Sequence, residues 1–161
     1  MRDNYMKRDK FIVIGCGRFG GQVATERSNE NLDVIIIDKY EDSFRKLHDN
    51  FEGFKEVGDA TQLDVLERGR ISEALNVLIC TNRDNVNILI ANICDKIFNV
   101  PNIYIRLMDT EKEALIDSEN IKPIYPYKLS LESFGNLFKD TLMRRKMRII
   151  IAGGQSKLIM Q

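Results

Sequence analysis

The sequence has 161 residues, 43% of them hydrophobic and 30% charged, and its 24 Lys and Arg residues balance 24 Asp and Glu residues. A chain of this length and composition can bury a substantial core, which favours one compact domain and excludes wholesale disorder. The net charge of zero provides no basic surplus for binding phosphate backbones, so we expect no nucleic-acid partner.

The sequence carries no signal of membrane insertion, secretion or metal binding. Its apolar runs are far shorter than the 18 residues expected of a membrane span, and its charged first ten residues lack the apolar core of a signal peptide. Cys16, Cys80 and Cys94 are odd in number and lack the spacing of metal ligands. These features predict a cytoplasmic protein with reduced, buried thiols, no metal site and no direct membrane insertion.

Short apolar runs alternate with helical patterns between residues 9 and 127. Several runs consist almost entirely of β-branched residues, typical of strands buried on both faces of a parallel sheet, and the runs occupy residues 11–14, 33–37, 54–57, 76–80, 103–107 and 123–125. Apolar residues at helical spacing predict helices at residues 41–51, 62–69, 84–98 and 110–119. The alternation predicts an α/β protein with a Rossmann-like, doubly wound parallel sheet of about six strands over residues 9–127.

The end of the chain has a different pattern. We predict an amphipathic helix at residues 128–146. Its apolar stripe consists of Leu129, Leu131, Phe134, Leu137, Phe138 and Leu142. The helix ends in a cluster of cations, which favour a helix C-terminus. Residues 147–154 form a further apolar run that ends in two glycines. We expect residues 147–161 to form either an extra strand or the start of a truncated second domain.

A G-x-G-x-x-G motif at residues 15–20 directly follows the first predicted strand. In such a motif Gly15 permits a tight turn, Gly17 lets backbone amides approach a pyrophosphate, and Gly20 lets the next helix pack closely on the strand. The anion then lies at the positive N-terminus of that helix. The motif therefore predicts a phosphate-binding loop. Its remaining members are Cys16, Arg18 and Phe19.

Charged residues in this first βαβ unit are candidates for binding an adenosine. Asp38 ends the second strand, where its carboxylate can accept hydrogen bonds from ribose hydroxyls and would repel a 2′-phosphate. The adjacent Lys39 could contact the ligand or lie at the surface. Arg18 could reach a terminal phosphate or an acid on a neighbouring subunit, or it could point into solvent.

Polar residues also follow the third and fourth strands. Asp59 and Ala60 could lie beside the adenine, or Asp59 could cap the next helix. Thr81 and Asn82 could bind a ribose or phosphate, or cap the helix that follows them. Arg106 lies in the apolar fifth strand and, because an unpaired buried charge is costly, needs a carboxylate or a ligand phosphate as its partner.

Taken together, these motifs resemble the RCK/KTN (TrkA-N) domains that regulate potassium channels and transporters. The resemblance covers about residues 9–143. It rests on the glycine motif, on V-G-D-A-T at residues 57–61, on T-N-R-D-N-V-N at residues 81–87, and on the two single residues Asp38 and Arg106. By this resemblance, residues 15–19 correspond to the family's phosphate loop, Asp38 to its ribose acid, Thr81 and Asn82 to its fourth-strand contacts, and Arg106 to its fifth-strand arginine.

The resemblance implies a cytosolic regulatory subunit that binds NAD(H) or ATP/ADP and gates a membrane potassium transporter or channel. Such a subunit would lie at the inner face of the cell membrane through its partner. The resemblance also implies homodimers, in which the helix at residues 129–143 crosses to a neighbouring subunit, and larger rings.

Two alternatives are a small NAD-dependent oxidoreductase and an assembly module that binds no nucleotide. The sequence has one histidine, His48, which falls on the helix predicted after the second strand, away from the strand ends. A catalytic triad, a paired-cysteine metal site and a P-loop are absent from the sequence. We therefore expect binding without catalysis.

Overall fold

The computed structural model describes residues 8–158, with side chains described through residue 152. The chain divides into two compact units, Met1–Tyr125 and Pro126–Gln161. The first unit carries the sheet and its connecting helices, and the second is a helix. Residues 1–7 of the charged N-terminal segment lie outside the described residues.

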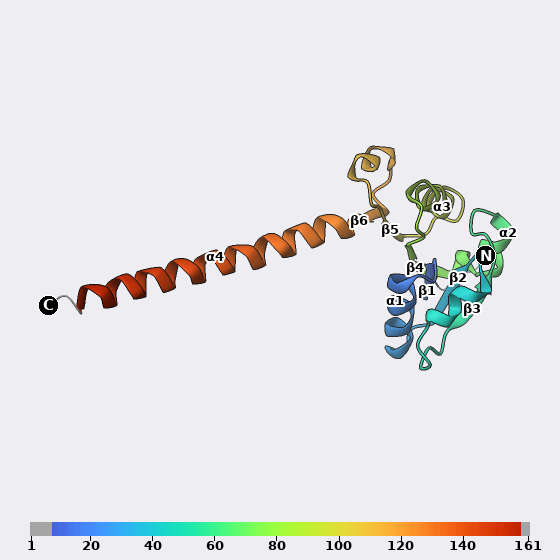
Figure 1. Ribbon diagram of the computed structural model, residues 1–161. Helices are drawn as coiled ribbons and strands as arrows, with labels where there is room; N and C mark the ends of the chain where they lie inside the picture. The colour runs from blue at the N-terminus through green and yellow to red at the C-terminus, as the bar shows by residue number, and fades with distance from the viewer. Residues whose placement is uncertain (1–7, 159–161) are drawn as a thin grey trace. The chain divides into compact units, whose positions relative to one another are not determined.

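A six-stranded parallel sheet forms the centre of the first unit (Figure 1). Its strands are β1 (Lys10–Ile14), β2 (Val34–Asp38), β3 (Phe54–Val57), β4 (Ala74–Ile79), β5 (Asn102–Arg106) and β6 (Ile121–Ile124). Their spatial order is β3-β2-β1-β4-β5-β6, and every neighbouring pair is parallel. This order confirms the predicted Rossmann-like, doubly wound sheet. The order reverses between β1 and β4, the point at which open α/β sheets bind ligands beyond their strand ends.

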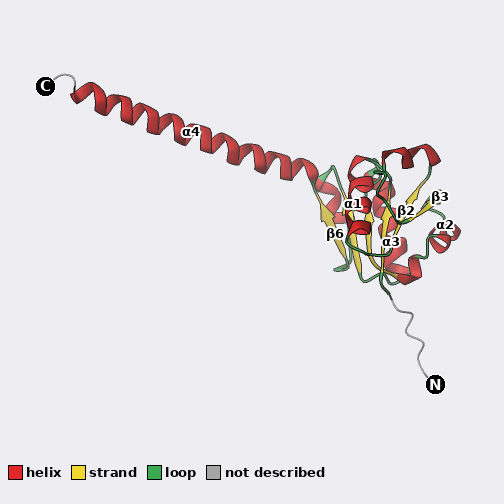
Figure 2. Ribbon diagram, turned by 90° about the horizontal axis from the view of Figure 1, so that it is seen from below, coloured by secondary structure: helices red, strands yellow, loops and turns green. Residues whose placement is uncertain are grey.

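Helices cover both faces of this sheet (Figure 2). Residues of α1 (Arg18–Asn29) and the 3-10 helix η1 (Glu41–Lys46) pack into the core on one face. Residues of α2 (Leu63–Arg68), η2 (Ile71–Glu73) and α3 (Asp84–Lys96) pack on the other.

The helices predicted at residues 41–51 and 110–119 are shorter than expected. The structure has only η1 in the first segment and the 3-10 helix η3 (Thr110–Leu115) in the second. Phe44 is the one buried residue of η1, and η3 has none. The apolar residues that follow these short helices, Leu47 and Phe51 in the first segment and Ile116 in the second, pack on the core from non-helical backbone.

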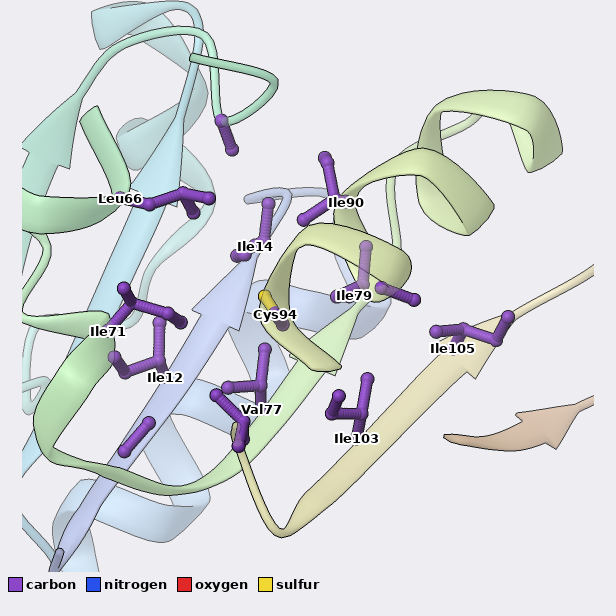
Figure 3. Packing of buried hydrophobic residues seen from close by; sticks show 14 of the residues in the cluster. Ile12, Ile14, Leu66, Ile71, Val77, Ile79, Ile90, Cys94, Ile103 and Ile105 are labelled. Atoms are coloured by element: carbon purple, nitrogen blue, oxygen red, sulfur yellow. The ribbon is translucent and has the colours of Figure 1, made fainter. Parts of the chain in front are cut away.

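The isoleucine-rich strands supply two cores, one on each face of the sheet. Along β2, Ile35 and Ile37 enter the cluster beneath α2 and α3, whereas Val34 and Ile36 enter the cluster beneath α1. Figure 3 shows the first cluster, in which Ile90 of α3 lies near Ile14 of β1 and Ile79 of β4. Burial on both faces explains why the strands read as continuous apolar runs in the sequence.

The second unit is the helix α4 (Pro126–Leu158). For residues 147–161 the expected alternatives were an extra strand or the start of a second domain, and the strand is wrong for the described residues, because residues 147–158 continue α4. Ile149, Ile150 and Ile151 are each at least 60% exposed, and none of the described strands pairs with them. Without a neighbouring strand, a helix is the way for this segment to satisfy its own backbone hydrogen bonds. Residues 159–161 of the expected terminal segment lie outside the described residues.

Within the described part of the chain, no helix is both long enough and apolar enough to cross a membrane. This holds for α4, whose apolar residues are interrupted by the cations Arg144, Arg145 and Lys146.

Two leucines on α2 provide a matched test of the core. Leu66 is fully buried, whereas Leu63 is 45% exposed on the same helix. We expect Leu66→Ala to lower the free energy of unfolding by about 2–5 kcal/mol, because it removes buried methyl groups and leaves a cavity. Leu63→Ala should cost less than about 1 kcal/mol. Urea denaturation followed by circular dichroism measures both, and equal losses would contradict the packing described here.

Candidate functional site

A cavity of about 640 Å³ opens at the carboxyl ends of the strands. Its volume falls within the range of small-molecule sites, roughly 300–1,000 Å³. It brings together ten of the thirteen predicted site residues, namely Gly15, Cys16, Gly17, Asp38, Lys39, Asp59, Ala60, Thr81, Asn82 and Arg106. The other three, Arg18, Phe19 and Gly20, lie in the first turn of α1 and do not line it.

The glycines of the loop between β1 and α1 serve different purposes. Gly15 adopts a φ of 105°, which L-residues rarely tolerate, and its N–H donates to the Ile37 carbonyl at 2.8 Å. A Cβ on Gly20 would lie 2.0 Å from the Gly15 carbonyl oxygen, so helix and loop pack here without room for a side chain. At Gly17 a Cβ would meet nothing within 4 Å. Gly17 therefore leaves open space at the cavity.

The N-terminus of α1 is suited to an anion. Gly17 is its N-cap and provides no side-chain hydrogen bond, and the first turn contains no acidic residue. The first four N–H groups of a helix have no partner within the helix, and its dipole places partial positive charge there. A phosphate beside Gly17 would satisfy both requirements.

Asp38 joins the end of β2 to the glycine loop. One carboxylate oxygen accepts the Cys16 N–H at 2.7 Å, and the other accepts the Tyr40 N–H at 2.9 Å. A carboxylate has about four acceptor positions, so two remain for the vicinal hydroxyls of a ribose. The loop that would hold phosphate and the acid that would hold ribose are thus fixed relative to each other.

Lys39 and Asp59 form an ion pair at the ends of β2 and β3. The Asp59 carboxylate accepts hydrogen bonds from the Thr61 hydroxyl at 2.7 Å, the Thr61 N–H at 3.0 Å and the Lys39 ammonium at 2.9 Å. The bonds from Thr61, together with that from Lys39, lower the pKa of Asp59 to about 2. The bond to Asp59 raises the pKa of Lys39. Asp59 does not cap α2, because the N-cap of that helix is Gln62.

Asn87 ties the end of β4 to the end of β5. This fully buried residue of α3 accepts the Thr81 N–H at 3.1 Å and donates to the carbonyls of Thr81 at 3.1 Å and of Arg106 at 2.8 Å. The Arg106 guanidinium donates to the Thr81 carbonyl at 2.8 Å, so a backbone oxygen takes the place of the expected carboxylate partner. Asn82 is exposed at the edge of the same cavity.

Sequence reasoning missed Asn87 as an organiser of the site and Val86 and Ile90 as part of the cavity wall. Val86 and Ile90 stand one helical turn apart on α3, a spacing visible in the sequence. Asn87 belongs to the T-N-R-D-N-V-N motif. Its position between the apolar residues Val86 and Ile88 was the sequence signal that this amide is buried and needs hydrogen-bond partners.

The cavity lacks the groups expected of a nucleophilic site. Burial raises the pKa of Cys16 to about 11 and that of Cys80 to about 12, so neither thiol ionises appreciably at neutral pH. His48 is exposed and does not line the cavity. Among the described residues, no cluster of His, Cys, Asp or Glu could hold a metal ion.

Comparison with known proteins identifies related chains. The family model of the TrkA-N domain matches residues 11–124. The Trk system potassium uptake protein TrkA of Vibrio alginolyticus is 33% identical over 113 residues, which are 68% of this chain and 25% of that protein. A TrkA homologue of Pyrococcus horikoshii is 34% identical over 118 residues, 72% of this chain and 50% of that protein. The chain thus spans a quarter to a half of the length of these relatives.

Solved structures share the fold. GsuK bound to ADP matches with a TM-score of 0.69 at 21% identity, over 85% of this chain and 35% of that one. The GsuK channel bound to NAD matches with a TM-score of 0.61 at 14% identity, over 76% of this chain and 22% of that one. At these identities the likeness establishes a common fold.

The two glycines Gly20 and Gly17 allow packing and cavity space to be tested separately. We expect Gly20→Ala to lower the melting temperature by several degrees or prevent folding, because its Cβ would overlap the Gly15 carbonyl oxygen. Gly17→Ala should change it little, since its Cβ enters open space. Thermal denaturation of both variants is the measurement. A Gly17 variant as unstable as the Gly20 variant would contradict this account of the loop.

Proposed function

The chain belongs to the TrkA-N domain family, and from this premise we propose that its cavity binds an adenine nucleotide, NAD(H) or ATP/ADP. The observation that carries the proposal is the convergence of the Asp38 carboxylate and the N-terminus of α1 on one cavity. The hydrogen bond between Cys16 and Asp38 fixes the distance between these two features.

The chemistry of the cavity suggests how the ligand is held. The phosphates bind beside Gly17, where α1 supplies unpaired N–H groups and partial positive charge. The ribose hydroxyls donate to the acceptor positions of Asp38 that Cys16 and Tyr40 leave open. The apolar side chains of Val86 and Ile90 give a wall, and Arg106 offers further guanidinium N–H groups to a phosphate.

We propose binding without turnover. A hydride-transfer enzyme needs a positioned acid or base beside the cofactor. The single histidine lies outside the cavity lining, and the two cavity thiols have raised pKa values. Asp59 is engaged by Thr61 and Lys39, and the open acceptor positions of Asp38 are assigned to the ribose. These features support a sensor over an oxidoreductase.

We further propose that the domain regulates a membrane potassium transporter or channel from its cytoplasmic side. Support comes from the relatives, which are named as potassium uptake proteins. The nucleotide would act by binding two states of the assembly with different affinity, since a ligand shifts an equilibrium only through such a difference.

The helix α4 is proposed as the contact between two copies of the chain. Its N-terminal half carries the predicted stripe, and the large apolar side chains there are exposed, including Leu131, Phe134, Phe138 and Leu142. Contiguous exposed apolar surface of this kind marks an interaction site. The rings of Phe134 and Phe138 stack with centroids 5.9 Å apart, one turn from each other on this stripe.

Calorimetric titration with ADP and NAD+ tests the binding proposal. Asp38→Ala should weaken binding by roughly 1–3 kcal/mol, because a charged hydrogen-bond acceptor of the ribose is lost. Gly17→Ala should also weaken binding while remaining folded, because its methyl group occupies the phosphate position. Asp42→Ala, at an 82% exposed acid outside the cavity lining, is the control. Absence of binding to the wild-type chain, or unchanged affinity in Asp38→Ala, would refute the assignment.

Light scattering coupled to size exclusion tests self-association. The wild-type chain should behave as a dimer, and the pair of substitutions Phe134→Ser and Phe138→Ser should yield a monomer with an intact sheet domain. Lys139→Ser, off the stripe on the same helix, should leave the dimer unchanged. A wild-type monomer at high micromolar concentration would exclude α4 as a self-association helix.

A further inference from the structure

We propose that the Lys39–Asp59 ion pair makes the cavity selective for adenosine ligands with a free 2′-hydroxyl over those with a 2′-phosphate. The inference rests on the proposed nucleotide function and adds a second determinant of ligand choice beside Asp38. Asp59 acts by holding the lysine that would otherwise bind the 2′-phosphate.

Lys39 is placed to affect the ribose. It directly follows Asp38, lines the same cavity and has a side chain that is 58% exposed, so it can change direction if its partner is removed. In this class of fold a nearby arginine accommodates the 2′-phosphate, and a free lysine ammonium supplies the same positive charge. Here, however, the Lys39 ammonium lies 2.9 Å from the Asp59 carboxylate.

Asp59 is itself held in place. Its other carboxylate oxygen accepts both the hydroxyl and the N–H of Thr61. The loop that carries it is fixed to β2 by the hydrogen bond from the Gly58 N–H to the Asp38 carbonyl at 2.9 Å. The parallel register of β2 and β3 pairs Asp38 with Val57, and so it also fixes the loop after β3 relative to the end of β2. Asp59 thus stays opposite Lys39 without help from a ligand.

The charges of Asp38, Lys39 and Asp59 predict the relative affinity of ligands with and without a 2′-phosphate. Beside Asp38, a 2′-phosphate in the wild-type cavity meets two carboxylates and a lysine whose charge is already compensated. The other cations of the lining, Lys46, Arg83 and Arg106, are the same in every variant compared. A free 2′-hydroxyl donates to Asp38 and needs no cation. Removing the charge of Asp59 leaves Lys39 uncompensated, which favours the phosphorylated ligand by long-range attraction and by a direct contact.

Asp59→Asn removes the charge and preserves the shape. The asparagine oxygen can still accept both bonds from Thr61, whereas the amide cannot compensate the lysine. Lys39→Met removes the cation and keeps most of the side-chain length. Combining the two variants gives a double-mutant cycle that isolates the contribution of Lys39 to the effect of Asp59.

The experiment measures Kd for NAD+ and NADP+, which differ only in the 2′-phosphate, by calorimetry at low salt. We expect the wild-type chain to prefer NAD+ by at least tenfold, and Asp59→Asn to reduce this ratio about three- to tenfold through tighter NADP+ binding. Adding Lys39→Met should abolish the gain. Asp42→Asn, which neutralises an acid outside the cavity lining, should leave the ratio unchanged. The effect should shrink at higher salt, because Lys39 is exposed.

The possible outcomes distinguish failure of the ion-pair role from failure of the proposed nucleotide binding. An unchanged ratio in Asp59→Asn, or a gain that survives Lys39→Met, overturns the role of the ion pair while NAD+ binding leaves the proposed function standing. A wild-type chain that binds neither dinucleotide nor ADP overturns both. Thermal denaturation checks that each variant is folded, and Asp59→Ser, which keeps an acceptor for Thr61, replaces Asp59→Asn if that variant is unstable.

Discussion

The candidate site depends on the hydrogen bond between the Cys16 N–H and the Asp38 carboxylate. Parallel pairing of β1 with β2 brings the two residues to the same edge of the sheet, and the positive φ of Gly15 turns the chain so that the N–H faces the acid. The bond then sets the distance between the N-terminus of α1 and the acceptor at the end of β2. Those are the two features to which the proposed nucleotide function assigns phosphate and ribose.

Similar ties recur along the edge of the sheet. Thr61 holds Asp59 after β3, and Asn87 holds Thr81 and Arg106 at the ends of β4 and β5. Asn87 joins two strand ends to α3, and Thr61 fixes Asp59 within its own loop, so the cavity walls are positioned by the fold before a ligand arrives. Such preorganisation reduces the ordering cost of binding. The same edge carries both signs of charge, with the Lys39–Asp59 ion pair and Asp38 at the ends of β2 and β3 and Arg106 on β5.

Much of this arrangement could be predicted because strands buried on both faces of a sheet are continuous apolar runs in the sequence. The apolar runs of β2 and β4 predicted strands buried on both faces of the sheet, and the glycine motif with Asp38 located the cavity. The same rule failed at Ile149–Ile151, where an apolar run without a pairing strand belongs to α4. The positioning role of Asn87 and the pairing of Lys39 with Asp59 depend on contacts between distant segments, which spacing in the sequence does not encode.

The proposed nucleotide site is the cavity over the glycine loop. A crystal structure of the chain grown with ADP or NAD+ tests it most directly. We expect electron density for phosphate beside Gly17 and for ribose hydroxyls within hydrogen-bonding distance of Asp38. An empty cavity at saturating nucleotide, or a nucleotide bound elsewhere on the chain, would contradict it.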